Sequence, residues 1–289
     1  MRPTLARRAF LRGCAACTSV LAAGAGLAET DELRFGLTPV FLTSDLELLS
    51  RLKTYLERAT GRRVKMITRR TYQEITSMLI SRELDAAWIC GYPFVANAGQ
   101  LALVAVPVWR GRPLYQSYLI AGKGRNAHSL VELKGDIHAF SDPDSNSGYL
   151  VTAAEMAGLG TTPDHFFSRA FFTYGHRNVV RAVDTGLAAS GSVDGYIYEV
   201  LKETEPNLVA GTEVVRKSAW LGFPPIACPA SLDRAPVTAA LRHALAAMPD
   251  DPDGRAVLAM LRLDGFREEP PTLFAPIAKL MQSLGGSRG

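Results

Sequence analysis

The sequence has few cysteines, and their spacing supports neither a disulfide framework nor a metal site. Only four of its 289 residues are cysteine, and Cys14 and Cys17 both lie near the N-terminus. Cys90 and Cys228 could pair in an oxidising compartment, but each is explained more simply as a small buried apolar side chain. The five histidines show no metal-ligand spacing with them, so we predict neither a metal nor a cofactor.

Long hydrophobic runs and a net charge on the main part of the chain are also missing. No run of eighteen apolar residues occurs, so no membrane span is predicted in the mature protein. The only charge excess comes from Arg2, Arg7, Arg8 and Arg12. Without these four, 28 of the 32 basic residues remain, against 28 acidic ones. Such a balance gives no global footprint for nucleic acid or an anionic membrane, and we expect a monomer that binds a small molecule.

The first 28 residues predict an export signal. Arg7-Arg8-Ala9-Phe10-Leu11 precedes a run of small apolar residues from Cys14 to Leu27. A basic start, a short apolar stretch and a small-residue end are typical of a signal cleaved after Ala28, and the arginine pair is similar to a twin-arginine signal. A lipoprotein signal at Cys14 or Cys17, or a disordered basic start on a cytosolic protein, is the alternative.

The remaining residues alternate between strand and helix patterns. Their 47% hydrophobic content supports a full core in one large domain or two lobes. Apolar strands are predicted at 33–38, 64–68 and 86–91, with helices over 45–58 and from Thr71, where Thr71 and Glu74 have capping-box spacing. The alternation indicates parallel α/β structure, in which ligands bind at the carboxyl ends of strands.

Later segments predict a second lobe inserted into the first. Strands are expected at 101–109, 115–120, 137–140, 171–176, 192–197 and 211–218, and helices at 150–157, 179–187, 235–248, 255–263 and 273–284. Gly122-Lys123-Gly124 is a flexible break at which we place the first crossing. We therefore predict lobe 1 from residues 29–118 and 213–289 and lobe 2 from residues 119–212, with hinges at 119–123 and 211–217.

The stretch from Ser141 to Leu150 is interpreted as an anion-binding loop. Ser145, Asn146 and Ser147 are residue types that cap helix N-termini, where free N–H groups and the helix dipole favour an anion. Gly148 permits close backbone approach, and no lysine or arginine is required. The alternative is an ordinary cap between a strand and a helix.

Several motifs, in order along the chain, resemble the substrate-binding proteins of phosphate, phosphite and phosphonate ABC importers. They are Asp142-Pro143-x-Ser145-Asn146-Ser147-Gly148-Tyr149-Leu150-Val151, Ala87-Trp88-x-x-Gly91, Gly175-His176, Val193-Asp194-Gly195-Tyr196 and Gly222-Phe223-Pro224-Pro225. The resemblance implies the α/β fold of type II periplasmic binding proteins, two lobes that close on a ligand in the periplasm. It also implies an ABC permease as partner and no enzymatic activity.

The resemblance also implies roles for individual residues. His176 and the Tyr72 phenol would donate to ligand oxygens, with the imidazole becoming a cation when an anion binds. Gly91 and Tyr92 either contact the ligand or form the interlobe wall, whereas Asp194 orients the backbone. The predicted ligand-binding residues are Tyr72, Gly91, Tyr92, Ser145, Asn146, Ser147 and His176.

One departure from the family concerns the ligand. Family members that bind an aminoalkyl phosphonate place an acidic group in the loop corresponding to residues 221–225, which here contains none. Because an unpaired buried ammonium is costly, we expect phosphite, phosphate or an alkylphosphonate. The alternatives are a binding protein for a membrane receptor and an enzyme on the same fold, using Asp194, His176 and Ser147.

Overall fold

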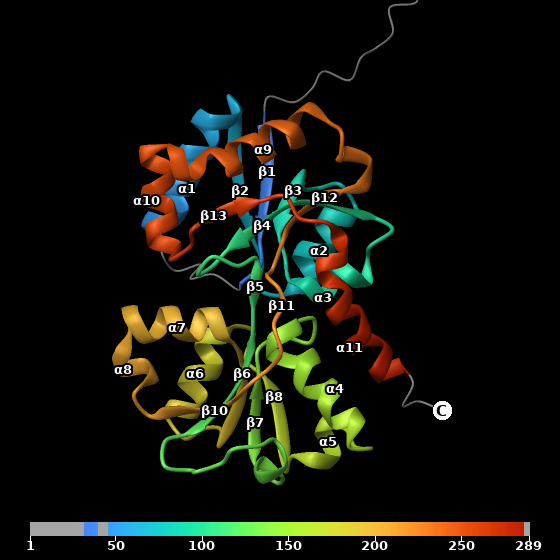
Figure 1. Ribbon diagram of the computed structural model, residues 1–289, viewed down its shortest axis with the longest axis vertical. Helices are drawn as coiled ribbons and strands as arrows, with labels where there is room; N and C mark the ends of the chain where they lie inside the picture. The colour runs from blue at the N-terminus through green and yellow to red at the C-terminus, as the bar shows by residue number, and fades with distance from the viewer. Residues whose placement is uncertain (1–31, 40–45, 286–289) are drawn as a thin grey trace, which may run out of the picture. The chain divides into compact units, whose positions relative to one another are not determined.

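The fold is built on two mixed β-sheets covered by helices (Figure 1). The computed structural model describes residues 32–39 and 46–285. The predicted export signal, its cleavage site after Ala28, and Asp45 at the predicted helix start lie outside the described residues. In the part of the chain that the structure describes, no helix combines the length and apolar character needed to cross a membrane.

The first sheet has six strands in the order β13–β4–β12–β3–β1–β2. β1 pairs in parallel with both β2 and β3, as the strand–helix alternation predicted. β12 and β13, from the C-terminal part of the chain, run antiparallel to their neighbours and make the sheet mixed. The strands are β1 (Glu32–Leu37), β2 (Arg63–Thr68), β3 (Ala86–Trp88), β4 (Leu101–Val108), β12 (Ile226–Pro229) and β13 (Gly265–Arg267).

Helices with one apolar face cover the first sheet. α1 buries Leu48, Leu52, Tyr55 and Leu56, which recur at helical spacing. The predicted capping box at α2 is confirmed, since Thr71 and Glu74 each bond the backbone of the other. The helices are α1 (Leu46–Thr60), α2 (Tyr72–Ile80), α3 (Gly91–Ala96), α9 (Pro236–Ala247), α10 (Pro252–Leu261) and α11 (Ala275–Gly285).

The second sheet has five strands in the order β10–β6–β9–β7–β8. β7 is parallel to β8 and β9, whereas β6 is antiparallel to β9 and β10. The strands are β6 (Ser117–Gly122), β7 (Ile137–Phe140), β8 (Arg169–Phe172), β9 (Ser190–Asp194) and β10 (Thr212–Lys217). The helices of this lobe are α4 (Val151–Gly158), α5 (Pro163–Phe166), α6 (His176–Asp184), α7 (Gly195–Thr204) and α8 (Pro206–Val209).

A two-stranded ribbon of β5 (Leu114–Tyr115) and β11 (Leu221–Gly222) lies between the two sheets (Figure 1). The chain therefore passes from the first sheet to the second before β6 and returns after β10. The first crossing thus precedes the Gly122-Lys123-Gly124 segment, which follows β6, and the segments predicted as hinges lie largely within β6 and β10. The lobe boundaries themselves stay a prediction.

Helix α11 contacts elements of both lobes. It packs against α3 and β11 at one end and against α4 at the other. On the first-lobe side, a Cβ added to Gly91 would lie 2.6 Å from Ile277 Cδ1, so the start of α3 fits closely against α11. On the second-lobe side, Leu280 of α11 faces Val151 and Ala154 of α4 across a shared surface groove. The C-terminal helix thus bridges the two sheets.

Two predicted strands end earlier than the sequence suggested, because helices begin inside them. The strand predicted at 171–176 ends at Phe172, and Gly175 serves as the N-cap of α6, whose first residue is His176. The strand predicted at 192–197 ends at Asp194, whose carboxylate caps α7. In both cases the backbone turns at the carboxyl end of a strand, which brings polar side chains to the mouth of the sheet.

Candidate functional site

Ten polar residues from both lobes meet in one buried group, which we call the interlobe cluster. Each member is at most 2% exposed. They come from the N-terminus of α2, the end of β3, strand β5, the loop after β7, the N-terminus of α6 and the end of β9. The members are Tyr72, Cys90, Tyr115, Ser141, Asp142, Ser145, Asn146, Ser147, His176 and Asp194.

The loop after β7 has the local structure of a helix cap. Ser145 Oγ accepts a hydrogen bond from Gly148 N at 2.9 Å, and residues 146–150 form a π-helical turn before α4. Such turns occur frequently at functional sites. A Cβ on Gly148 would lie 1.8 Å from Ser141 Oγ, so only glycine permits this approach. The Ser145 oxygen therefore acts as a helix cap, and the predicted role of Ser145 in ligand binding stays a prediction.

Asn146 ties the loop to the first lobe and to the ribbon between the lobes. Its backbone N lies 3.1 Å from Cys90 Sγ, and its Nδ2 donates to the Tyr115 hydroxyl at 2.8 Å. Burial raises the pKa of the Cys90 thiol to about 12, so this sulfur is a neutral acceptor. Ser117 Oγ holds the loop from the other side by donating to the Ser147 carbonyl at 2.6 Å. The loop is thereby fixed at three points.

Three polar side-chain atoms of this loop have no hydrogen-bond partner among the described residues. They are Ser141 Oγ, Asn146 Oδ1 and Ser147 Oγ. The Ser147 hydroxyl makes no hydrogen bond within the described ranges, but it does interact with Tyr115. It lowers the pKa of the Tyr115 phenol, against the larger effect of burial, which raises it. Buried polar atoms are nearly always paired, so three exceptions in one loop indicate a place for a polar guest.

His176 is a neutral hydrogen-bonding group in this arrangement. Asp194 N donates to His176 Nδ1 at 3.1 Å, which leaves the ring proton on Nε2, 3.2 Å from the Tyr72 hydroxyl. Burial lowers the pKa of His176 to about 3. The expectation that the imidazole becomes a cation when an anion binds stays a prediction; in this geometry a backbone N–H occupies the nitrogen that would take the second proton.

The two carboxylates of the interlobe cluster bind backbone N–H groups. Asp194 Oδ1 accepts from Tyr196 N at 2.8 Å and from Ile197 N at 3.3 Å, which confirms its predicted capping role. Burial raises the pKa of Asp194 to about 7. Asp142 Oδ2 accepts from Tyr72 N at 3.2 Å and so joins the two lobes; burial raises its pKa as well.

Lysine and arginine are absent from the buried polar residues that the structure describes. Any charge on a guest of the interlobe cluster would therefore be met by hydroxyls, amides and one neutral imidazole. In the described ranges, no group of three His, Cys, Asp or Glu residues could hold a metal ion.

An aromatic wall borders the interlobe cluster on the side of the β5–β11 ribbon. The Phe223 ring lies 5.5 Å from the Tyr115 ring and 5.1 Å from the Tyr196 ring. The carbonyl of Pro224 accepts from Trp88 Nε1 at 2.9 Å, so the loop over residues 221–225 directs its polar backbone to the first lobe. This wall contains no acidic group.

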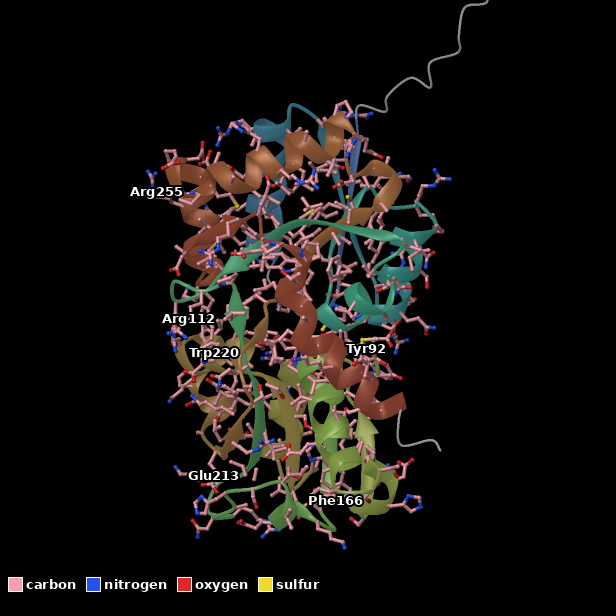
Figure 2. The ribbon with its side chains drawn as sticks, turned by 45° about the vertical axis from the view of Figure 1, so that its right-hand side comes forward. Tyr92, Arg112, Phe166, Glu213, Trp220 and Arg255 are labelled. Atoms are coloured by element: carbon pink, nitrogen blue, oxygen red, sulfur yellow. The ribbon has the colours of Figure 1, made fainter. Side chains whose placement is uncertain are left out.

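The structure brings five of the seven predicted residues into the interlobe cluster: Tyr72, Ser145, Asn146, Ser147 and His176. Gly91 follows Cys90 and packs against α11. Tyr92 is half-buried on α3, beside α11, and packs against the hydrophobic core (Figure 2). Sequence reasoning missed Tyr115 and Ser141. Ser141 could have been found, since it directly follows a strand in the same loop, whereas Tyr115 carried no local signal.

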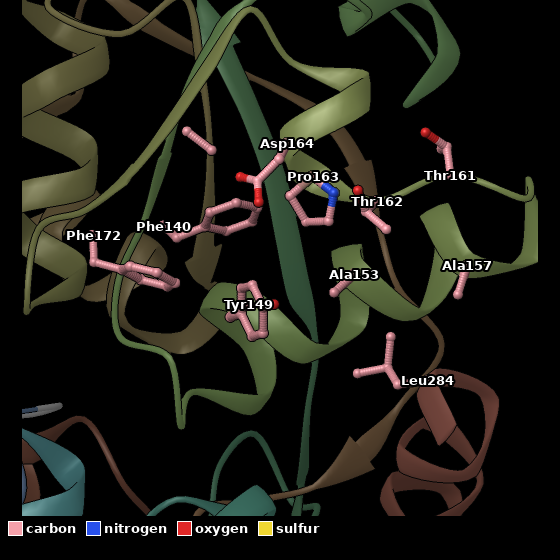
Figure 3. Close-up of a pocket in the computed structure, with 11 residues that line it drawn as sticks. Phe140, Tyr149, Ala153, Ala157, Thr161, Thr162, Pro163, Asp164, Phe172 and Leu284 are labelled. Carbon is pink, nitrogen blue, oxygen red and sulfur yellow. The ribbon is translucent and has the colours of Figure 1, made fainter. Parts of the chain in front are cut away.

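A concave surface lies elsewhere, between elements of the second lobe and Leu284 of α11 (Figure 3). Its lining is mostly apolar and aromatic and includes no member of the interlobe cluster. The lining residues are Phe140, Tyr149, Ala153, Ala157, Thr161, Thr162, Pro163, Asp164, Ala170, Phe172 and Leu284. A pocket without converging hydrogen-bond donors does not suit an oxyanion, so we take the interlobe cluster as the candidate site.

Two α/β lobes joined by a two-stranded ribbon, with a buried polar cluster between them, define a type II periplasmic binding protein. Residues 35–270 match the family model described as the periplasmic substrate-binding protein of phosphonate ABC transporters. The chain belongs to this family. It is thus a solute-binding component of an importer and not an enzyme, as the sequence predicted.

Solved structures share the fold. A binding protein component of an ABC phosphonate transporter from Pseudomonas aeruginosa is 23% identical, with a TM-score of 0.79 over 86% of this chain and 85% of that one. PhnD1 from Prochlorococcus marinus, in complex with methylphosphonate, is 17% identical, with a TM-score of 0.79 over 88% and 98%. The alkanesulfonate-binding protein SsuA from Xanthomonas axonopodis is more distant, 16% identical with a TM-score of 0.56 over 89% and 84%.

Proposed function

We propose that this importer component binds a small phosphorus oxyanion without an ammonium tail: phosphite, phosphate or a short alkylphosphonate. The observation that carries the proposal is the pair of buried hydroxyls without partners, Ser141 Oγ and Ser147 Oγ. Both lie in a loop that is held in place by its own backbone and by Asn146. The ligand-binding residues of the proposal are Tyr72, Ser141, Asn146, Ser147 and His176, with Gly91 and Tyr92 at the adjacent wall.

Neutral donors suit a carrier of anions. Hydrogen bonds to a desolvated anion are strong, with each contributing about 1.5–3 kcal/mol. A site without a buried lysine or arginine binds the anion without a permanent ion pair that would oppose release to the permease. His176 Nε2–H lies 3.2 Å from the Tyr72 hydroxyl, which can accept this bond and still donate its own proton to a guest.

The aromatic wall supports a small and uncharged ligand tail. Phe223 is fully buried between Tyr115 and Tyr196. A methyl group or a hydrogen on phosphorus fits against such rings, whereas an ammonium would lack an acidic partner in residues 221–225. The methylphosphonate complex of the related PhnD1 agrees with a tail of this kind.

We further propose the setting in which the protein works. An export signal with a twin-arginine pattern would deliver the chain to the periplasm, with cleavage after Ala28. There it would act as a monomer, without nucleic-acid partners, and deliver its ligand to an inner-membrane permease. Mass spectrometry of the exported protein tests the cleavage site: a mature N-terminus other than Glu29 would contradict it.

Calorimetric titration of the purified protein with phosphite, phosphate, methylphosphonate, sulfate and 2-aminoethylphosphonate tests the ligand class. We expect phosphite or methylphosphonate to bind most tightly. Tighter binding of 2-aminoethylphosphonate would overturn the assignment of an uncharged tail. Binding of sulfate alone would overturn the assignment of a phosphorus oxyanion.

A further inference from the structure

We infer that the site takes its oxyanion in the singly charged, protonated form, with the P–O–H group donating to Asn146 Oδ1. This inference rests on the proposed function. Asn146 is fully buried, its Nδ2 donates to Tyr115, and its Oδ1 has no partner among the described residues. A carbonyl oxygen can only accept a hydrogen bond.

The other groups that remain for a guest can donate. Ser141 Oγ and Ser147 Oγ are hydroxyls without partners, and His176 carries its ring proton on Nε2 because Asp194 N occupies Nδ1. A fully deprotonated oxyanion offers only acceptors, and one of its oxygens would face the Asn146 carbonyl oxygen. The hydrogen form offers several acceptors and one O–H donor. The donor and acceptor pattern of the loop therefore matches the hydrogen form.

The orientation of the Asn146 side chain is set by the residues around it. Its backbone N is held against Cys90 Sγ at 3.1 Å, and its Nδ2 lies 2.8 Å from the phenol of Tyr115, which is buried against Phe223. Tyr115 comes from the ribbon and Cys90 from the first lobe, so the ribbon holds the side-chain amide and the first lobe holds the backbone N–H. Its oxygen is left as the group that a guest can meet.

The charges of the interlobe cluster also favour a singly charged guest. The titratable groups of the interlobe cluster are Cys90, Tyr72, Tyr115, His176, Asp142 and Asp194. Burial keeps the thiol, the two phenols and the imidazole neutral at physiological pH, because it raises the first three pKa values and lowers that of His176. The two remaining groups are carboxylates. A second negative charge on the guest would meet these carboxylates in a low-dielectric region without a buried cation.

The affinity for a phosphonate should then depend on pH through the ligand's own second ionisation. Methylphosphonate has a second proton to lose, whereas hypophosphite is a monoanion with no O–H over the same range. Asp194, with its pKa raised to about 7, also titrates there, but it acts equally on two guests that are both bound as monoanions. The ratio of the two affinities therefore isolates the protonation of the ligand.

The experiment is calorimetry of the purified protein with methylphosphonate and with hypophosphite from about pH 6 to about pH 9. Above the second pKa of methylphosphonate, we expect its affinity to fall about tenfold per pH unit relative to that of hypophosphite. Parallel profiles for the two ligands would overturn the inference and would indicate that the amide presents its NH2 group instead. Failure of all phosphorus ligands to bind at every pH would overturn the proposed function itself, and this inference with it.

A variant sharpens the test. Asn146→Leu removes the acceptor at similar size, and we expect the extra pH dependence of methylphosphonate binding to shrink to the part that the two carboxylates cause. Ser190→Ala, a buried serine outside the interlobe cluster, is the matched control and should keep the wild-type profile. If Asn146→Leu folds and retains the full pH dependence, the assignment to Asn146 is wrong. If it does not fold, the wild-type comparison alone decides.

Discussion

The second lobe contains a second buried polar group that differs from the interlobe cluster in one respect. We call it the His138 cluster: His138, Thr152, Ser190 and Ser192. His138 Nδ1 bonds Ser190 Oγ at 2.8 Å, His138 Nε2 bonds Ser192 Oγ at 2.9 Å, and Ser192 Oγ bonds Thr152 Oγ1 at 2.7 Å. Each of these side chains has a partner from the same lobe.

The two groups contain similar side chains but differ in whether their hydrogen-bonding atoms all have partners. Both place a fully buried histidine among serine hydroxyls, and burial lowers the pKa of both imidazoles to about 3. The His138 ring also stacks on Phe167 with centroids 4.1 Å apart. In the interlobe cluster the contacts cross between lobes, and three atoms stay without partners. Burial and pKa shift are common to both groups; unused hydrogen-bonding capacity distinguishes the proposed binding site.

The largest effect should come from removing the unused hydroxyls. Ser141→Ala combined with Ser147→Ala should weaken ligand binding by about 3 kcal/mol or more, since charge-assisted hydrogen bonds contribute about 1.5–3 kcal/mol each. The stability of the ligand-free protein should change little, because neither hydroxyl has a partner to lose. Calorimetry and chemical denaturation measure the two quantities. Unchanged affinity in a folded double variant would remove the loop from the site.

The opposite pattern is expected in the His138 cluster. His138→Asn should lower the free energy of unfolding by about 1–3 kcal/mol, because it removes the partner of the buried Ser190 hydroxyl and one of the two partners of Ser192 Oγ. Ligand affinity at neutral pH should stay within about twofold of wild type. A large loss of affinity in a fully folded variant would mean that the His138 cluster and the interlobe cluster are coupled.

The pH dependence of stability should differ between His138→Asn and wild type. His138 has its pKa lowered from 6.5 to about 3 by burial, so the unfolded chain takes up this proton well before the folded one. The contribution of neutral His138 is thus fully present above about pH 6.5 and is lost as pH falls toward 3. The stability advantage of wild type over His138→Asn should shrink by up to about 1.4 kcal/mol per pH unit in that window. Denaturation at several pH values measures it, and a constant difference would contradict a neutral His138.

The smallest effect is expected at the helix cap. Ser145→Ala removes the acceptor of Gly148 N and should destabilise the protein by about 1 kcal/mol, the usual contribution of an N-cap. Ser145→Thr, which keeps the hydroxyl, should restore most of the stability. If Ser145→Ala left thermal stability unchanged but abolished binding, its hydroxyl would belong with those of Ser141 and Ser147.

Local sequence patterns predicted the parts of this site that depend on near neighbours. The cap at Ser145, the capping box at Thr71 and the role of Asp194 are all set by hydrogen bonds within a few residues. His176 was found through family resemblance, yet it was placed at the end of a strand. Gly175 in fact begins a helix there.

Contacts between distant segments could not be predicted in this way. Tyr115 meets Asn146 only because the ribbon and the loop after β7 are brought together by the fold. The antiparallel pairing of β12 with β3 and β4 likewise joins strands more than a hundred residues apart. A single sequence carries no local pattern for such pairings, since tertiary packing and not local propensity selects them.

The bridging position of α11 has a practical consequence for following ligand capture. Because this helix touches α3 in one lobe and α4 in the other, any separation of the lobes must change its contacts on at least one side. Gln282 lies on an exposed position of α11, and the described cysteines Cys90 and Cys228 are buried. A fluorophore on a cysteine at this position would therefore report the motion of the two lobes without replacing a member of the interlobe cluster.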